Sequence, residues 1–451
     1  MSSQLELPLE GRGEAPSVRR SGEARTVAHG DGRLGSDQGL MELVVERENC
    51  LRALKRVRRN KGGPGIDGMT VEELPGFLRE NWEAIREGLL AGTYRPSPVK
   101  RREIPKSGGG VRQLGIPTVL DRFIQQAILQ VLQPIFDPTF SEHSHGFRPG
   151  RRAHDAVREA QRYIQEGRRW VVDVDLKKFF DRVNHDVLMG RLAKRLGDRR
   201  LLRILRRCLE AGVMANGVVV ERHRGTPQGG PLSPLLANVL LDEVDKELER
   251  RGLAFVRYAD DCNVYVRSRR AAERVMEGLK GLFAKLKLRV NEEKSAVAPV
   301  WNRQFLGYSF WVAKGGAVKR RVGASALEDF KQRIRWITRR IVGRSMGQVA
   351  EKLRTYLLGW KAYFQLADTP GVFKRLDQWI RRRLRALQLK HWKRGGTVYR
   401  KLVARGVSEY RVRVAARYAR SWWHVAVHET LQQALPVAHF DQLGVPRLAT
   451  H

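Results

Sequence analysis

The sequence contains only three cysteines in 451 residues, and they are far apart in the chain. Cys50, Cys208 and Cys262 form no C-x-x-C motif, so neither a zinc module nor a disulfide framework is indicated, and a reducing cytoplasm fits. The chain also lacks an apolar run of about 18 residues, and its N-terminus lacks a continuous apolar segment. We therefore expect no membrane-spanning helix and no secretion signal, and we predict a cytoplasmic location.

Acidic residues are scarce relative to basic ones. Lys and Arg together number 85 against 48 Asp and Glu, which gives a formal charge of +37. An excess of this size predicts a polyanionic partner, and the Trp and Tyr residues among the cations favour nucleic acid over a merely solvated surface. A membrane surface is the rival polyanion, but the basic helices have ordinary, well-filled apolar faces.

Hydrophobic periodicity divides the chain into five segments. Residues 1–38 have the composition of a flexible tail, and residues 39–95 have helical spacing interrupted by a glycine-rich loop. Residues 96–315 alternate between strand and helix patterns, which is typical of an α+β fold. Helical spacing resumes over residues 325–395, and residues 396–451 form a basic region that we expect to bind nucleic acid.

The third helix expected in the C-terminal half is unusually basic. Its cations, some of which lie away from the apolar stripe, are Arg381, Arg382, Arg383, Arg385 and Lys390. Ordinary solvated charge is one interpretation, but the basicity of the whole chain favours contact with RNA.

Two acidic strand ends are candidates for metal binding. The stretch "FVRYADDCNVYVRS" predicts a hairpin with Asp260 and Asp261 at its turn, and "VVDVDLKKFFD" places Asp173 and Asp175 on one face of another strand. Nucleotidyl transfer needs two divalent cations roughly 4 Å apart, held by oxygen ligands. An Asp-Asp pair alone is common in turns, so the second acidic strand carries part of the argument. Spacing alone does not choose between Asp173 and Asp175.

Two further segments have features of phosphate-binding sites. "VKRREIPKSGGGVRQLGIPT" predicts a basic hairpin with Lys106 and Arg112 on its arms. "RGTPQGGPLSPLLANVL" places Gln228 between a Pro/Gly loop and a helix N-terminus, where the backbone can approach a ligand. A plain loop before a core helix is the alternative for the second segment.

Several blocks, taken in order, resemble a known family. "VDLKKFFD", "GTPQGGPLSPLLANVLLDEVD", "YADD", "LRVNEEKS" and "QFLGYSF" resemble the palm motifs of reverse transcriptases. "NKGGPGIDGMTVEEL", "IPKSGGGVRQLGIPTVLDR" and "FSEHSHGFRPGRRAHDAV" are similar to finger blocks of group II intron-encoded reverse transcriptases, and "LRTYLLGWKAYFQLADTP" resembles their maturase domain. The resemblance covers roughly residues 41–445 and implies an α+β right-hand polymerase. Its fingers and palm would carry an antiparallel sheet, followed by an α-helical thumb or maturase domain.

The resemblance also implies a set of catalytic residues. Asp175, Asp260 and Asp261 match the ligands of two Mg²⁺ ions, which leaves Asp173 as a neighbour. The residues that match contacts to the dNTP are Lys106 and Arg112 for the triphosphate, Phe180 for exclusion of a 2′-hydroxyl, Gln228 for the pocket wall, and Lys294. Lys294 matches a lysine near the leaving phosphates, and an ordinary surface lysine is an equal alternative.

The function implied is an RNA-directed DNA polymerase that also binds its host group II intron RNA and assists splicing and mobility. Its partners would be that RNA, an RNA template, a DNA primer or target, and dNTPs. The alternatives are a maturase that only assists splicing and a related enzyme recruited to host defence. The sequence does not indicate an oligomeric state.

The C-terminal region departs from the longest members of the family. Many of these end in an endonuclease domain with paired Cys and His ligands, whereas no cysteine follows Cys262, so we expect no endonuclease. His424 and His428 have i, i+4 spacing but lack the Glu of H-E-x-x-H, which favours packing or phosphate contact. Trp422 and Trp423 fit either base stacking or a core position.

Overall fold

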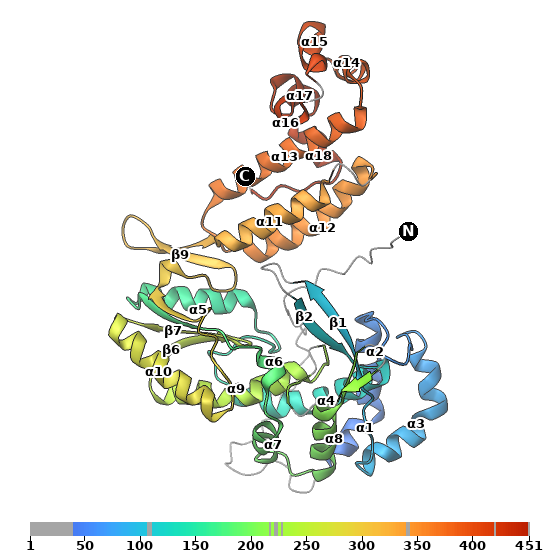
Figure 1. Ribbon diagram of the computed structural model, residues 1–451, viewed down its shortest axis with the longest axis vertical. Helices are drawn as coiled ribbons and strands as arrows, with labels where there is room; N and C mark the ends of the chain where they lie inside the picture. The colour runs from blue at the N-terminus through green and yellow to red at the C-terminus, as the bar shows by residue number, and fades with distance from the viewer. Residues whose placement is uncertain are drawn as a thin grey trace. The chain divides into compact units, whose positions relative to one another are not determined.

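A computed structural model describes residues 39–105, 111–215, 218–220, 224–226, 229–339, 343–418 and 421–449 (Figure 1). The chain divides into two compact units, Met1–Val300 and Trp301–His451. Within these described ranges, no helix is both long enough and apolar enough to cross a membrane.

The first unit begins with a helical layer. Its helices are α1 (Leu40–Val45), α2 (Arg47–Arg59) and α3 (Leu74–Leu90), and α1 and α2 both pack on α4 (Val119–Phe136). Asn49 is buried in α2, and its side-chain amide donates to the carbonyl oxygen of Ala127 in α4 at 3.1 Å. This buried hydrogen bond joins the N-terminal helices to α4 and fixes their packing geometry.

The finger sheet has the strand order β2-β1-β4-β5. Its strands are β1 (Val99–Pro105), β2 (Val111–Ile116), β4 (Val213–Ala215) and β5 (Val218–Val220). The predicted hairpin is confirmed, because β1 and β2 pair antiparallel with Lys100 opposite Ile116. The parallel pairing of β1 with β4 was not predicted, because it joins segments that are far apart in sequence.

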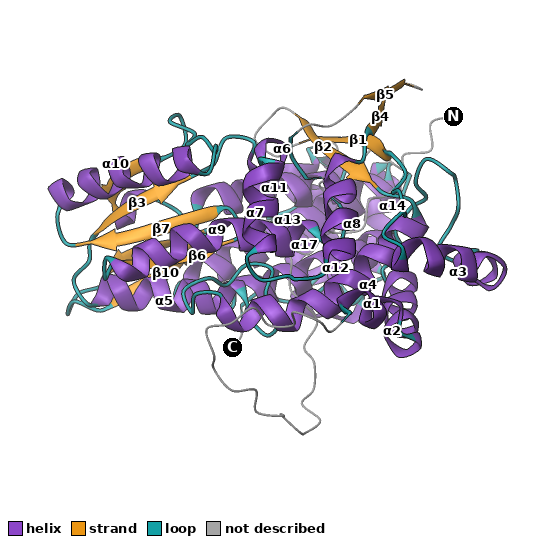
Figure 2. Ribbon diagram, turned by 90° about the horizontal axis from the view of Figure 1, so that it is seen from below, coloured by secondary structure: helices purple, strands orange, loops and turns teal. Residues whose placement is uncertain are grey.

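The palm sheet has the strand order β6-β7-β3-β8, and every pair is antiparallel. Its strands are β3 (Trp170–Val174), β6 (Ala254–Tyr258), β7 (Asp261–Val266) and β8 (Ala296–Pro299). Helix α10 (Arg269–Lys285) contacts β3, β7 and β8, and α5 (Ala153–Gln165) contacts β6 and β7. These two helices lie on opposite sides of the sheet (Figure 2). Val172 and Val174 are buried in the main core, as their alternation with aspartates predicted.

Further helices complete the first unit. They are η1 (Asp137–Thr139), α6 (Phe179–Arg182), α7 (His185–Ala193), α8 (Arg199–Glu210), α9 (Ser233–Arg250) and η2 (Val300–Asn302). The Asp198 side chain caps α8 by accepting from the backbone N–H groups of Arg200 and Leu201.

The second unit consists of a hairpin and helices, in agreement with the predicted helical thumb. Its elements are β9 (Tyr308–Val312), β10 (Val318–Val322), α11 (Ala324–Ile337), α12 (Met346–Phe364), α13 (Pro370–Trp392), α14 (Gly395–Val403), α15 (Glu409–Arg417), α16 (Trp422–Val425), α17 (Glu429–Ala434) and α18 (Val437–Gln442). Phe330, Trp360 and Phe364 form its aromatic centre, with ring centroids of neighbouring pairs 4.4 and 4.7 Å apart.

Two arginines of α13, Arg381 and Arg385, are buried and bond inside the second unit, which differs from the contact with RNA expected of them. Arg381 is 2% exposed and donates to the Asp441 carboxylate at 3.0 Å, and Arg385 donates to the carbonyl oxygen of Leu435 at 3.0 Å. Arg382 and Arg383 are partly buried and also donate to acceptors in this unit. The segments after α13 pack along it, and their carbonyl and carboxylate groups need donors.

The C-terminal histidines and tryptophans have local roles. His424 lies in α16 and His428 precedes α17, so the predicted helical i, i+4 spacing is interrupted. The His428 side chain caps α17 by accepting from the backbone N–H of Thr430. Arg382 Cζ lies 3.9 Å from the centroid of the Trp423 ring, and Lys390 Nζ lies 5.4 Å from the centroid of the Trp422 ring. Both rings therefore make cation–π contacts within the unit.

Candidate active site

The β6–β7 hairpin holds the paired aspartates in a tight turn. Tyr258 and Asp261 are the last paired residues, so Ala259 and Asp260 alone form the loop. Ala259 has a φ of 58°, a left-handed conformation that favours glycine. Asp260 therefore lies in the turn and Asp261 at the first position of β7.

The register of the palm sheet brings Asp175 next to this turn. Strands β3 and β7 pair antiparallel, and their last pair is Val174 opposite Cys262. Continuing this register by one residue places Asp175 opposite Asp261. Facing residues in an antiparallel pair have Cβ atoms roughly 5 Å apart. Asp173 lies two positions before Asp175 on the same face of the strand, opposite Asn263.

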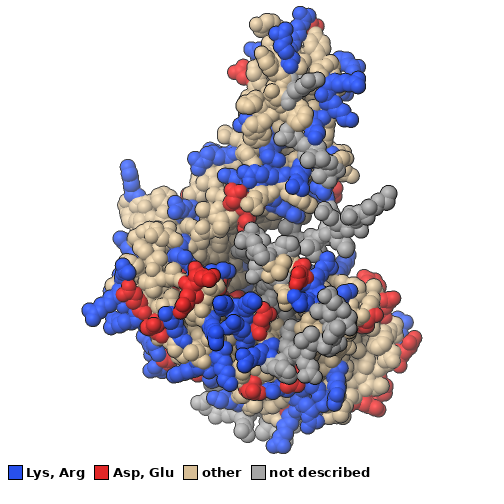
Figure 3. Space-filling view, in the orientation of Figure 1, with Lys and Arg blue, Asp and Glu red and all other residues tan. Residues whose placement is uncertain are grey.

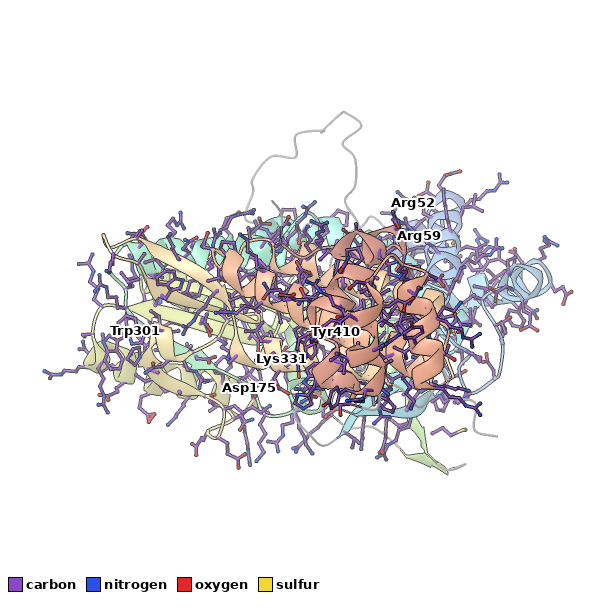
Figure 4. The ribbon with its side chains drawn as sticks, turned by 90° about the horizontal axis from the view of Figure 1, so that it is seen from above. Arg52, Arg59, Asp175, Trp301, Lys331 and Tyr410 are labelled. Carbon is purple, nitrogen blue, oxygen red and sulfur yellow. The ribbon has the colours of Figure 1, made fainter. Side chains whose placement is uncertain are left out.

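The segment before β8 holds Asp175 in place. The Asn291 side-chain amide donates to Asp175 Oδ1 at 3.2 Å, and Ser295 Oγ accepts from the backbone N–H of Asp175 at 3.0 Å. Lys294 Nζ is 3.9 Å from Asp175 Oδ2, although 64% of the lysine side chain is exposed. The structure thus places Lys294 beside the Asp175 carboxylate. It also shows that Asn291 contacts this carboxylate, and the only sign of this in the sequence is that Asn291 lies in the same block, LRVNEEKS. Asp175 is labelled in Figure 4.

Phe180 lies in α6, directly after the strand that leads to Asp175. Its side chain is 8% exposed and meets the Phe179 ring edge-on, with centroids 5.1 Å apart. Its carbonyl oxygen accepts from the backbone N–H of Thr226 at 2.7 Å. A Cβ on Gly225, which has a φ of 89°, would lie 2.8 Å from the same oxygen, so the loop needs glycine there. The loop that leads into the PQGG motif therefore rests on α6.

The PQGG motif also approaches the finger sheet. A Cβ on Gly229, which has a φ of 128°, would lie 2.9 Å from the carbonyl oxygen of Gly115 in β2. Gln228 and Lys106 lie outside the described residues. Arg112 pairs with Ile104 through its backbone in β2, but its side chain is outside the described part. The roles of these three residues therefore stay predictions.

The side chains at the strand ends are of the kind that hard divalent cations prefer. Asp175, Asp260 and Asp261 offer carboxylate oxygens, the donors expected for Mg²⁺. Cys262, next to Asp261, is 1% exposed, and burial raises the pKa of its thiol to about 12. Among the residues that the structure describes, no three His, Cys, Asp or Glu side chains are already gathered as a metal site. Metal binding would therefore have to draw the carboxylates together from neighbouring backbone positions.

Basic side chains cover more of the visible surface than acidic ones (Figure 3). Arg52 and Arg59 project from the exposed face of α2 (Figure 4). An excess of exposed cations is the electrostatic feature that long polyanions recognise.

Comparison with known proteins gives two domain matches. Residues 104–310 match the family described as reverse transcriptase (RNA-dependent DNA polymerase), and residues 327–406 match the maturase-specific domain of group II introns.

Individual proteins also match this chain. Protein YkfC of Escherichia coli K12 is 33% identical over 304 residues, which cover 58% of this chain and 80% of YkfC. Group II intron-encoded protein LtrA of Lactococcus lactis is 32% identical over 336 residues, which cover 59% of this chain and 56% of LtrA. A solved partial Cas6-RT-Cas1--Cas2 complex matches 55% of this chain and 43% of the other at 27% identity, with a TM-score of 0.36.

Proposed function

This chain belongs to the family of group II intron-encoded reverse transcriptases and maturases, whose catalytic domain is an RNA-directed DNA polymerase, and we propose that Asp175, Asp260 and Asp261 form its catalytic centre. Polymerases of this family use a divalent metal, and we propose that here it is Mg²⁺, held by these three carboxylates. The observation that carries the proposal is the register of β3 and β7, which continues to Asp175 opposite Asp261.

The reaction proposed is attack of a primer 3′-hydroxyl on the α-phosphate of a dNTP, with pyrophosphate as the leaving group. Bound Mg²⁺ would supply activation of the hydroxyl and neutralisation of the leaving group. Lys294, beside Asp175, would add a positive charge for the phosphates. Asn291 would orient the Asp175 carboxylate through its 3.2 Å hydrogen bond.

The remaining nucleotide contacts are proposals from the family pattern. Phe180 would exclude a 2′-hydroxyl, and its position on α6 next to the loop before PQGG supports this role. Gln228 would line the nucleotide pocket. Lys106 and Arg112 would grip the triphosphate from the finger hairpin.

The biological role proposed is binding of a host group II intron RNA, with help in its splicing and in its copying into DNA. The two matched domains imply RNA and other nucleic acids as partners. Because this chain spans 56% of the length of LtrA, the intron-specific activities are proposals. We also propose action in the cytoplasm, from the sparse cysteines.

The decisive experiment is primer extension by the purified protein. We expect it to extend a DNA primer on an RNA template when Mg²⁺ and the four dNTPs are present. Incorporation of labelled dNTP, resolved on a denaturing gel, measures the activity. RNA binding without any extension would instead favour the maturase that only assists splicing.

We propose that residues 396–451 form a region that binds nucleic acid. The exposed face of α15 is the candidate binding surface in this region. Tyr410 is 81% exposed and Tyr418 is 58% exposed, and both lie on the stripe that includes Val414. Exposed arginines flank this stripe at positions 411, 413 and 417. Exposed aromatic rings among arginines suit stacking of unpaired bases.

We expect the double substitution Tyr410→Ala and Tyr418→Ala to weaken RNA binding. Stacking contributes about 1–3 kcal/mol per base, so the loss should be at least roughly fivefold in Kd. Filter binding to a single-stranded RNA measures it. Val437→Ala, at a 40% exposed position on α18, is the control and should bind normally. Equal affinities of the double variant and the control would remove α15 from the interface.

A further inference from the structure

The turn that carries Asp260 is held by three residues that come from separate segments. We propose that Arg257, Asn238 and Gly146 act as positioning residues, a turn clamp, that fixes the β6–β7 turn and hence the directions of the Asp260 and Asp261 carboxylates. This inference rests on the proposed catalytic role of those aspartates.

Arg257 connects the turn to helix α9. Its side chain is 1% exposed, and its Nη1 donates to the carbonyl oxygen of Ala259 at 2.9 Å. Its Nε and Nη2 donate to the two carboxylate oxygens of Asp245 at 2.7 and 2.5 Å. This two-point pairing fixes the plane of the guanidinium group. The orientation of the Nη1 hydrogen bond to the Ala259 carbonyl oxygen is therefore fixed as well. Lysine has the same charge but not this planar fork.

Asn238 joins Arg257 to a third segment. Its side-chain oxygen accepts from Arg257 Nη1 at 2.9 Å, and its side-chain nitrogen donates to the carbonyl oxygen of Gly146 at 2.9 Å. Asn238 is 1% exposed, so both bonds are shielded from water. Loss of either partner would leave a buried polar group without its bond.

Gly146 lies directly against the turn. A Cβ at this position would be 2.1 Å from the backbone nitrogen of Ala259, so even alanine would displace the turn or the segment. The adjacent segment cannot easily retreat, because the His145 N–H donates to the carbonyl oxygen of Arg257 and the Arg257 N–H donates to that of His143.

Glu159 of α5 fixes the same segment from its other side. His143 Nδ1 and His145 Nε2 are 2.7 and 2.6 Å from its two carboxylate oxygens. Burial alone would raise the pKa of Glu159, but bonds from His143, His145 and Tyr163 lower it to about 2. Glu159 is therefore charged at neutral pH and holds both histidines, so Gly146 presses on the turn from a rigid support.

Stability alone does not explain this arrangement. A fully buried ion pair such as Arg257–Asp245 often stabilises a fold no better than well-packed apolar residues. What the clamp supplies is geometry, because the left-handed Ala259 needs surroundings that determine its conformation. The turn so defined starts β7 at Asp261, and continuing the β3–β7 register by one residue places Asp175 opposite it.

The test compares two clamp variants with two matched controls. Gly146→Ala adds one methyl group at the turn, and Gly190→Ala adds one in α7 where no atom lies within 4 Å. Arg257→Lys removes the fork at the turn, and Arg381→Lys changes a similarly buried arginine in the second unit, whose partner Asp441 is 29% exposed. Three quantities are measured on each full-length protein: the rate of primer extension at saturating dNTP, binding of Mn²⁺ by calorimetry, and the Tm.

We expect both clamp variants to lose on the order of 10- to 100-fold in extension rate, because small misplacements of reacting groups have effects of this size. Their Mn²⁺ affinity should fall several-fold as well, whereas the controls should keep both properties at comparable Tm. Clamp variants that match the controls in rate and in Mn²⁺ affinity would overturn the proposal. If Arg257→Lys does not fold, Gly146→Ala and Asn238→Ala decide.

Failure of the underlying function gives a different result. An inactive wild-type protein would refute the polymerase proposal, while the Mn²⁺ measurements would still test the clamp. An active wild-type protein with a fully active Gly146→Ala variant would refute the clamp alone.

Discussion

Replacing Asp260 by alanine should abolish primer extension while leaving RNA binding nearly unchanged. A carboxylate that helps to hold two divalent ions contributes several kcal/mol to stabilisation of the transition state, so a loss of at least about a thousandfold is expected. Asp260 is only partly buried, and Arg257 holds the turn backbone through the carbonyl oxygen of Ala259. The substitution should therefore not disturb folding. Single-turnover extension of a labelled primer measures the rate, and filter binding measures RNA affinity.

Asp173→Asn is the matched control for this experiment. Asp173 lies on the same face of β3 and is also acidic, but it pairs with Asn263, two positions before Asp175. The control should retain most of the activity. Full activity of Asp260→Ala, or an equal loss in Asp173→Asn, would contradict the assignment of the three ligands.

Replacing Phe180 by valine should let the enzyme incorporate ribonucleotides. The smaller side chain would leave space for a 2′-hydroxyl, and a steric exclusion of this kind is typically worth about 2–3 kcal/mol, or roughly 30- to 150-fold in discrimination. The ratio of kcat/KM for dNTP to that for NTP, measured by single-nucleotide extension, should fall by this factor.

The cost of this substitution in stability needs its own control. Phe180 is 8% exposed and packs against Phe179, so Phe180→Val should also lower the Tm. Phe179→Val removes a buried ring of the same size from the same helix and should lower the Tm to a similar or greater extent. It should leave sugar discrimination intact. Unchanged discrimination in Phe180→Val would remove its proposed role.

The buried arginines of α13, Arg381 and Arg385, differ from the exposed cations that the sequence predicted. A run of cations on a helix predicts an exposed surface, because charged side chains are seldom buried without partners. The partners here are Asp441 and the carbonyl oxygens of Leu435 and Trp423, which follow their arginines by 41 to 60 positions. No local sequence pattern identifies acceptors at such distances. Only the folded unit shows which cations are buried, as in α13, and which are exposed, as in α15.

The contacts that support the β6–β7 turn could not be predicted from the sequence either. The position of Asp260 at the tip of a hairpin follows from strand alternation on both sides of it. The roles of Gly146 and Asn238 depend instead on contacts with Ala259 and Arg257, which lie in other segments.

The sequence by itself determined the α+β class, the finger and palm hairpins, the helical C-terminal half and the family. Each of these follows from short-range hydrophobic periodicity or from motifs that are contiguous in the chain. Only the tertiary structure decided that the β3–β7 register continues to Asp175 opposite Asp261. It also decided that Lys294 and Asn291 lie beside the Asp175 carboxylate. Register between distant strands is set by which faces pack into the shared core, a choice made by the whole sheet and its helices together.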